Sequence, residues 1–214
     1  MIAITFAVPH ESADLRKAMR GDEVVIAHTG IGTVAAEKCV SSLIATHRPR
    51  WLLSAGYAGA LDPAIAHGEL FAATNFTSPE LLDRSTARRG ILTTQQSAAE
   101  TPTQKAALAR ETGAQAVDME TSAIAAVCAA HGVPLLSLRA ISDTASAHIP
   151  VPLHVSYDLK KQRPRIFALL AFLAGNPSRI LPFARFVRGL TPARAALTTE
   201  IIALLQSEHE RERA

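Results

Sequence analysis

The chain has 214 residues, of which 48% are hydrophobic and 19% are charged, and its formal net charge at pH 7 is +3. These values are ordinary for one globular domain with a sizeable core, and they exclude a disordered or fibrous chain. The charge is too small to indicate nucleic-acid binding, and the first 150 residues show no basic patch interleaved with aromatic residues. The apolar run at the start is too short for a signal peptide or a membrane span. Cys39 and Cys128 lie in apolar helical surroundings, so we expect buried free thiols in a reducing, cytoplasmic compartment.

An acidic residue stands between the first predicted strand and the first predicted helix. Residues 1–8 predict the strand, and Asp14 begins the helix soon after it. Glu11 lies between the two, where it would sit at the carboxyl edge of a sheet. The alternative interpretation is a favourable acid at the first turn of the helix, where the helix dipole stabilises negative charge.

A glycine turn follows the second predicted strand, residues 23–27. Gly30, Gly32 and Ala35 match the spacing of a dinucleotide-binding fingerprint, but the acidic residue that this fingerprint needs at the end of the next strand is missing. The match alone indicates NAD only weakly, and we predict no cofactor. A glycine turn that leads into a helix, here predicted for residues 33–47, still favours an anion or a hydroxyl group.

Small residues end the third predicted strand, which begins at Trp51. Ala58 and Gly59 would let a ligand touch the backbone beside Tyr57. Further along the chain, the sequence predicts strands at residues 68–75 and 90–94 and an amphipathic helix at residues 103–112.

Two acidic residues frame an apolar part of the stretch 117–143. The alanine-rich segment 121–130 predicts a helix that lies very close to its neighbours, with Glu120 at its first turn. Residues 133–141 are mostly apolar, which is typical of a strand buried on both faces. This strand leads to Asp143, and the carboxyl ends of such strands are where open α/β sheets bind ligands. The two carboxylates would then meet at one edge. The alternative is that the first caps a helix and the second is a turn residue.

The last part of the chain combines basic and apolar residues. Residues 160–190 contain seven Lys and Arg side chains, four Phe and no Asp or Glu, in two predicted helical segments with a break at residues 175–177. This pattern is typical of a helix that lies on a membrane surface. The alternative is an apolar face that covers the sheet or a subunit interface while the arginines face water. Just before this part, the loop 144–152 with its two prolines could cover a site at the sheet edge.

Two motifs resemble the nucleoside phosphorylase/nucleosidase family, which includes methylthioadenosine/S-adenosylhomocysteine nucleosidase, futalosine hydrolase and the hopanoid-associated nucleosidases. They are Val117-Asp118-Met119-Glu120 before the small-residue helix and Arg139-Ala140-Ile141-Ser142-Asp143 at the end of the next strand. Glu11, followed four and five residues later by Leu and Arg, also matches. The resemblance covers residues 2–143 well. It implies a single α/β domain over residues 1–214, with a mixed, twisted central sheet flanked by helices, a core of residues 1–155 and a basic helical C-terminal segment 156–214.

The resemblance also implies a purine nucleosidase, which hydrolyses the N-glycosidic bond of an adenosine-type nucleoside with a 5′ substituent. Glu11 would be the base that activates water. Asp143 would protonate the purine at N7, for which it must hold a proton near neutral pH. Glu120 would accept hydrogen bonds from the ribose hydroxyls, and Ser142 and Arg139 would orient Asp143. The substrate-binding residues implied in this way are Met119, Glu120, Ser142, Arg139, Gly32, Tyr57, Ala58, Gly59 and Ala98.

Two other functions stay open. In a phosphorylase, phosphate replaces water, but Tyr57 stands where many relatives have a serine that contacts phosphate. Arg84, Arg88 and Arg89 match no phosphate-binding motif, so their default interpretation is a solvated loop. A non-catalytic nucleoside- or membrane-binding protein would not need all three acids. The basic tail resembles that of the hopanoid-associated members, whose substrate is a lipid-linked nucleoside. We therefore expect a small-molecule substrate, no metal, a homo-oligomer as in the family, and peripheral membrane contact through residues 160–190 as one interpretation.

Overall fold

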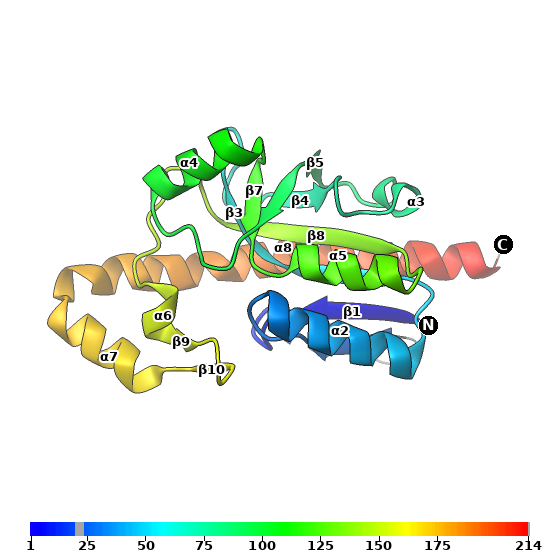
Figure 1. Cartoon of the computed structure of the whole chain (residues 1–214), viewed down its shortest axis with the longest axis horizontal. Helices are drawn as coiled ribbons and strands as arrows, with labels where there is room; N and C mark the ends of the chain where they lie inside the picture. Colours follow the sequence, from blue (N-terminus) through cyan, green and yellow to red (C-terminus); the bar gives the residue numbers. More distant parts are fainter. Residues whose placement is uncertain (20–23, 214) are drawn as a thin grey trace.

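The computed structural model describes residues 1–19 and 24–213, in which strands and helices follow one another largely as the sequence predicts (Figure 1). The predicted start of the second strand at Glu23 lies outside the described residues. The strands are β1 (Ile2–Phe6), β2 (Val24–His28), β3 (Leu52–Ala60), β4 (Leu70–Ala73), β5 (Arg88–Gly90), β6 (Leu92–Thr94), β7 (Ala116–Asp118), β8 (Leu135–Asp143), β9 (Tyr157–Asp158) and β10 (Arg163–Pro164). The helices are α1 (Ala13–Ala18), α2 (Thr33–His47), α3 (Pro79–Leu82), α4 (Pro102–Thr112), α5 (Thr121–Ala130), α6 (Leu153–Ser156), α7 (Ile166–Gly175), the 3-10 helix η1 (Pro177–Arg179) and α8 (Ile180–Arg213).

Eight of the described strands form one mixed sheet. Its main path runs β2-β1-β3-β8-β4-β5, and β7 pairs with both β3 and β6. β3 is parallel to β1 and β8, whereas β7 is antiparallel to β3 and β4 is antiparallel to β8. The predicted mixed sheet flanked by helices is thus confirmed. Because β1, β3 and β8 are parallel, their carboxyl ends meet at one edge of the sheet.

Helices cover both faces of this sheet. On one face α2 and α5 lie side by side, and Val40 and Ile124 share a buried cluster with Leu135 of β8 (Figure 1). On the other face α8 runs across the sheet, and Leu197 shares a second cluster with Leu136. Successive side chains of a strand point to opposite faces, so β8 contributes alternately to the two layers.

Several element boundaries differ from the predictions by one or more residues, and two of these differences change the description of the sheet. The strand predicted for residues 90–94 is interrupted at Ile91, whose N–H donates to the side-chain Oε1 of Gln115 at 2.7 Å. β8 begins and ends two residues later than the apolar run 133–141, and Asp143 is its last residue, as the motif at the end of this strand predicts. A buried strand therefore holds this carboxylate, and the interpretation as a turn residue is wrong.

The C-terminal part divides at residue 193. Beyond it, α8 packs onto the sheet through Ala193, Leu197, Ile201 and Leu204. No residue from 152 to 192 is buried. The predicted break at residues 175–177 is present, and the helices before and after it are bent by 111° relative to each other. Among the described residues, no single helix is long and apolar enough to cross a membrane. The two helices of this bent pair, taken together, reach the length and apolar composition of a membrane span.

Candidate active site

A cavity of about 330 Å³ lies at the carboxyl edge of the sheet. Gly32 and Arg139 are the two predicted site residues that do not line it. Ile149 and Leu153 contribute to its wall, so the segment after β8 covers the site as expected, and Leu190 of α8 closes another side. The nine predicted residues that line the cavity are Glu11, Tyr57, Ala58, Gly59, Ala98, Met119, Glu120, Ser142 and Asp143.

Glu11 is held by two backbone groups in the turn after β1. Its Oε2 accepts a hydrogen bond from the Val8 N–H at 3.0 Å, and its Oε1 accepts one from the Tyr57 N–H at 3.1 Å. Gly56 is needed beside it, since a Cβ there would lie 3.0 Å from Oε1. Burial raises the pKa of the Glu11 carboxyl, and the two hydrogen bonds and the charge of Arg139 offset part of this effect.

Glu120 connects α5 to the glycine turn before α2. It occupies the N-cap position of α5 but makes no capping hydrogen bond with its side chain. Instead, its Oε1 accepts from the Gly32 N–H at 2.7 Å. Burial raises the pKa of Glu120 to about 8, and the nearby charges of Asp118 and Glu11 act in the same direction. The helix-cap interpretation is therefore wrong for this side chain. Gly32 holds Glu120 in place without lining the cavity itself.

The pKa of Glu120 leads to a pH prediction. The folded protein holds this proton up to about pH 8, whereas the unfolded chain releases it near the ordinary value of 4.5. Between these values the folded state binds more protons, so the free energy of unfolding should decrease as the pH rises. In Glu120→Gln the side chain cannot ionise, although its Oε1 can still accept from Gly32. The variant should therefore lose less stability in this window, measured by urea unfolding at about pH 5, 7 and 9.

The exposed Glu37 provides the control for this measurement. Glu37→Gln should keep the pH dependence of the wild type. Some dependence should also survive in Glu120→Gln, because the pKa of Glu11 is raised as well. An unchanged slope in Glu120→Gln would contradict the assignment of the proton to Glu120.

Asp143 forms an ion pair that the sequence did not reveal. Ser142 Oγ donates to its Oδ1 at 2.6 Å, as expected. Its Oδ2 accepts from the ammonium group of Lys105, which lies on α4 and has 0% of its side chain exposed. Gly59 leaves room for this carboxylate, since a Cβ there would lie 3.1 Å from Oδ2.

A weak signal for Lys105 is present in the sequence. The segment 103–112 has the pattern of an amphipathic helix, and Lys105 lies three and four residues before Leu108 and Ala109, on the same face. A lysine in line with the apolar face of a helix has to find an acceptor inside the protein. The identity of that acceptor, 38 residues away, could not be deduced from spacing.

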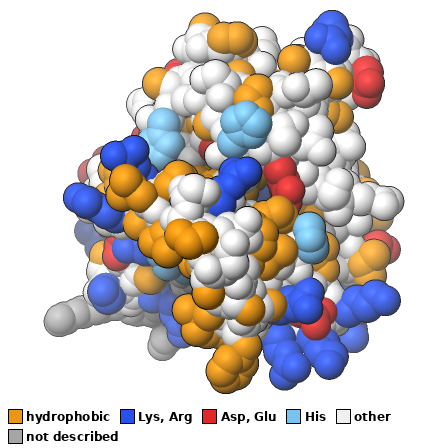
Figure 2. Space-filling view, turned by 90° about the vertical axis from the view of Figure 1, so that its left-hand side faces the viewer, with side chains coloured by type: hydrophobic (Ala, Val, Ile, Leu, Met, Phe, Trp, Pro, Cys, Tyr) orange, Lys and Arg blue, Asp and Glu red, His pale blue; other side chains and the backbone are white. Residues whose placement is uncertain are grey.

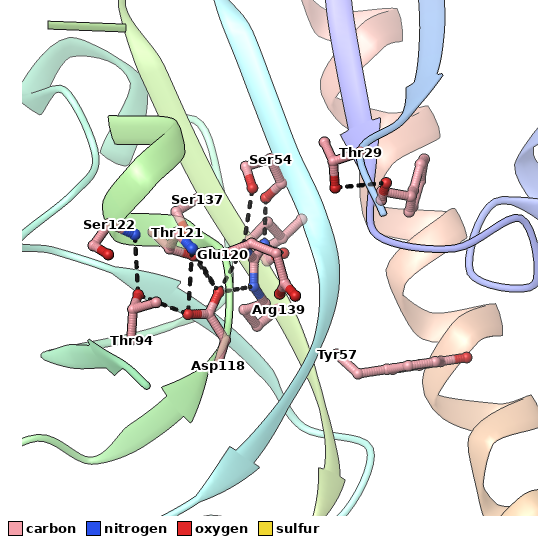
Figure 3. Close-up of polar contacts among 12 residues, drawn as sticks. Thr29, Ser54, Tyr57, Thr94, Asp118, Glu120, Thr121, Ser122, Ser137 and Arg139 are labelled. Carbon is pink, nitrogen blue, oxygen red and sulfur yellow. Dashed lines mark hydrogen bonds and ion pairs between the residues drawn. The ribbon is translucent and has the colours of Figure 1, made fainter. Parts of the chain in front are cut away.

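Arg139 binds elsewhere than predicted. Its Nη2 donates to Asp118 Oδ2 at 2.9 Å, its Nη1 donates to the Ser54 carbonyl at 2.6 Å, and its Nη2 also contacts Thr121 Oγ1 (Figure 3). The side chain is only 3% exposed. These contacts do not include Asp143, so they give no support to the prediction that Arg139 orients it, and its role as a substrate-binding residue stays a prediction. Alternation along β8 turns it toward the start of α5 instead.

The Arg139 network fixes the segment that carries Met119 and Glu120. Asp118 also accepts hydrogen bonds from Thr94 Oγ1 at 2.8 Å and from the hydroxyl of Thr121 (Figure 3). The network thus ties β6, β7, α5 and β8 together. Asp118, for which the sequence alone indicates no role of its own, is in the middle of this network and also lines the cavity.

The arginines considered as phosphate ligands lie outside the cavity. Arg84 pairs with Glu208, Arg88 lies 3.5 Å from Asp62 and also from Glu69, and Arg89 pairs with Asp83. No Lys or Arg is among the described residues that line the cavity. In the described ranges, no three His, Cys, Asp or Glu side chains gather in a way that could hold a metal ion.

Solved structures share this fold. Futalosine hydrolase of Helicobacter pylori matches with a TM-score of 0.71 and 18% identity, over 96% of this chain and 97% of that one. The 5′-methylthioadenosine/S-adenosylhomocysteine nucleosidase from Neisseria meningitidis, in complex with methylthio-immucillin-A, matches with a TM-score of 0.71 and 18% identity, over 96% of this chain and 98% of that one. The corresponding Campylobacter jejuni nucleosidase matches with a TM-score of 0.62 and 23% identity, over 75% of this chain and 90% of that one. Because the sequence identities are this low, the comparisons show a similar fold and nothing more.

The chain is an α/β protein with one mixed sheet and a cavity lined by carboxylates at the carboxyl edge of that sheet. The family model of the Phosphorylase superfamily matches residues 3–90 and 80–171. The chain belongs to this superfamily.

Proposed function

We propose that the protein is a purine nucleosidase that hydrolyses the N-glycosidic bond of an adenosine-type nucleoside with a 5′ substituent. The observation that carries the proposal is the cavity itself, where Glu11, Glu120 and Asp143 are brought together from three separate parts of the chain. Support also comes from the names of the similar structures, a futalosine hydrolase and nucleosidases for 5′-methylthioadenosine.

Each acid has a role in this reaction. Glu11 takes a proton from the attacking water, and its raised pKa suits a base that works near neutral pH. Glu120 accepts hydrogen bonds from the ribose hydroxyls, and the carboxyl groups around the sugar stabilise the positive charge that develops as the bond to the base breaks. Met119 packs against the sugar, and Asp143 serves the leaving base.

Phosphorolysis is the second candidate and is less well supported. A phosphate nucleophile needs cationic or N–H donors around it, and the described cavity lining carries several acids and no Lys or Arg. Tyr57 directs its hydroxyl away, toward α8, where it donates to the Leu190 carbonyl at 3.2 Å (Figure 3). A purely binding function is disfavoured because recognition of a nucleoside does not need several buried acids.

Product chromatography tests the proposed function. The protein is incubated with adenosine, 5′-methylthioadenosine and a 5′-alkyl adenosine, with and without phosphate. Free adenine and the free sugar, formed at the same rate in both conditions, are the expected result. A sugar 1-phosphate that forms only with phosphate would make the protein a phosphorylase. Tight binding of a nucleoside with no cleavage would favour a binding protein.

We propose further that the 5′ substituent is apolar, as in a lipid-linked (hopanoid) adenosine. The supporting observation is that the cavity has apolar walls beside its acids, to which Ile149, Leu153 and Leu190 contribute. These side chains offer apolar surroundings for a substituent that extends beyond the ribose. A second hollow of about 250 Å³, with Pro182 and Phe186 of α8 in its walls, adjoins the cavity at Ser142 and Asp143.

The same end of the molecule supports peripheral membrane contact. We name residues 160–190 the basic arm. Hydrophobic side chains gather on this end of the molecule with Lys and Arg side chains on either side of them (Figure 2). Phe167 is 89% exposed, although α7 is a strongly apolar helix. An exposed apolar face combined with cationic side chains favours the surface of an anionic membrane. The exposed large hydrophobic residues of the arm are Ile166, Phe167, Leu170, Ile180, Leu181 and Val187.

Vesicle flotation tests the basic arm. The wild type should float with vesicles of phosphatidylserine and phosphatidylcholine, and binding should weaken with salt. Phe167→Asp combined with Leu170→Asp should lower binding by at least about tenfold, since two apolar side chains lose their burial in lipid. Val34→Asp, at an equally open position on α2, is the matched control. Unchanged flotation together with loss of an oligomer would make the arm a subunit interface instead.

The oligomeric state and the compartment also remain proposals. An open hollow beside α2, lined by small residues such as Ala27, Thr29, Ala35 and Ser42, offers a surface on which a second copy could pack. The free thiols of Cys39 and Cys128 are consistent with a cytoplasmic protein at the membrane surface.

A further inference from the structure

Lys105 is a buried cation directly behind the acid that would serve the leaving base. All three of its N–H groups have an acceptor: Asp143 Oδ2, the Thr144 carbonyl at 2.7 Å and the Ala147 carbonyl at 3.2 Å. The start of α4 fixes its position, because Thr101 and Gln104, four residues and one residue before it, form a capping box. Lys105 is not among the residues that line the cavity.

This placement is unfavourable as a purely structural device. Removal of an ammonium group from water is unfavourable, and a protein with an apolar residue of similar size in its place would often be as stable or more stable. A surface lysine elsewhere on α4 would avoid this penalty. The ammonium group is instead positioned so that its one ionic partner is the carboxylate at the edge of the cavity.

We propose that Lys105 supplies, through Asp143, the proton that the leaving base takes up. The proposal rests on the proposed nucleosidase function. When the C–N bond breaks, its electron pair moves to the base. A ring nitrogen of the base then takes a proton from the Asp143 carboxyl group, which takes one from the Lys105 ammonium group. Lys105 is left as a neutral amine and Asp143 as a carboxylate. Glu11 holds the proton of the attacking water, and proton exchange with solvent restores Lys105 and Glu11 after the products leave.

The order of these transfers follows from charge. Before reaction Asp143 Oδ2 accepts a hydrogen bond from the ammonium group of Lys105, which is therefore the proton source in direct contact with this acid. As the bond breaks, negative charge develops on the base and makes it a stronger proton acceptor. Lys105 is a positioning residue by its location, because the proton reaches the substrate only through Asp143. Ser142 holds the other carboxylate oxygen in place.

The test compares two leaving groups in Lys105→Met. A purine needs a proton to leave, whereas 4-nitrophenolate leaves well without one. In Lys105→Met, kcat for the purine nucleoside should fall by at least about 100-fold, with little change in KM. The same variant should cleave a 4-nitrophenyl riboside within about tenfold of the wild type. Lys105→Arg should keep the low purine activity, because a guanidinium group retains the charge but does not give up a proton. Arg110→Met, at an exposed position of the same helix, should behave as the wild type.

Two further measurements separate this role from a structural one. Asp143→Asn should show the same leaving-group pattern, and the double variant Lys105→Met/Asp143→Asn should be no worse than either single variant. The double variant also leaves no unpaired buried charge, so its activity can be measured even if Lys105→Met alone does not fold. Equal losses on both substrates, or normal purine turnover, would overturn the proposal for Lys105 alone. If the wild type cleaves no nucleoside, the proposed function fails and this role of Lys105 fails with it.

Discussion

Glu11→Gln should lower kcat for nucleoside hydrolysis by about 100- to 10,000-fold, the usual range for loss of a general base. The amide cannot accept the proton of the attacking water, although its oxygen can keep the hydrogen bond from Tyr57. Its NH₂ group would face the Val8 N–H, so a loss of about 1–3 kcal/mol of stability should accompany the change. Rates are therefore measured on folded protein, with the exposed Glu37→Gln as the control.

The pH dependence of the wild type tests the same residue. The base must be ionised, and burial raises the pKa of Glu11 above its ordinary value of 4.5. We therefore expect kcat/KM to rise with pH on the acid side, with a midpoint above that value, and Glu11→Gln to lack this rise. A variant with near-normal turnover would show that another group activates the water.

Arg139→Met should lower the free energy of unfolding by about 3–5 kcal/mol, because Asp118 would remain buried without its cation. For a chain of this size the loss corresponds to a decrease in Tm of roughly 6–20 °C. Urea unfolding followed by circular dichroism measures the effect. The pair is well suited to such a test, since both side chains are almost completely buried.

The matched variant for this prediction removes both charges. Arg139→Met/Asp118→Asn should recover most of the lost stability, since no unpaired buried charge remains. Arg139→Lys should recover less, because an ammonium group cannot reproduce the forked contacts to Asp118 and Ser54. A variant at Arg139 that keeps its stability but loses substrate affinity would support the prediction of a substrate ligand.

The sequence predicted the position of the site because local patterns decide it. Buried strands are apolar runs in the sequence. Glu11 lies shortly after β1 and Asp143 ends β8, and both of these strands are parallel to β3 in the sheet. Contacts between distant segments could not be predicted in this way. The partner of Lys105 depends on how α4 packs near the end of β8, and the interruption at Ile91 depends on the side chain of Gln115.

The C-terminal part shows a different limit. An amphipathic helix that covers a sheet and one that lies on a membrane have the same sequence pattern. The sequence therefore left both interpretations open for residues 160–190. The structure separates residues 152–192 from the rest of α8, which composition could not do. Side chains such as Leu197 and Ile201 are buried in the core cluster beside the sheet, whereas no residue from 152 to 192 is buried.

Gly56 and Gly59 of β3 have a consequence for the redesign of this protein. A Cβ at either position would come within about 3 Å of a carboxylate oxygen, of Glu11 in one case and of Asp143 in the other. One strand in the middle of the sheet thus sets the spacing between the two acids, and even a methyl group there would change it. Substrate range should therefore be altered at Ile149, Leu153 and Leu190, which line the cavity without touching this spacing.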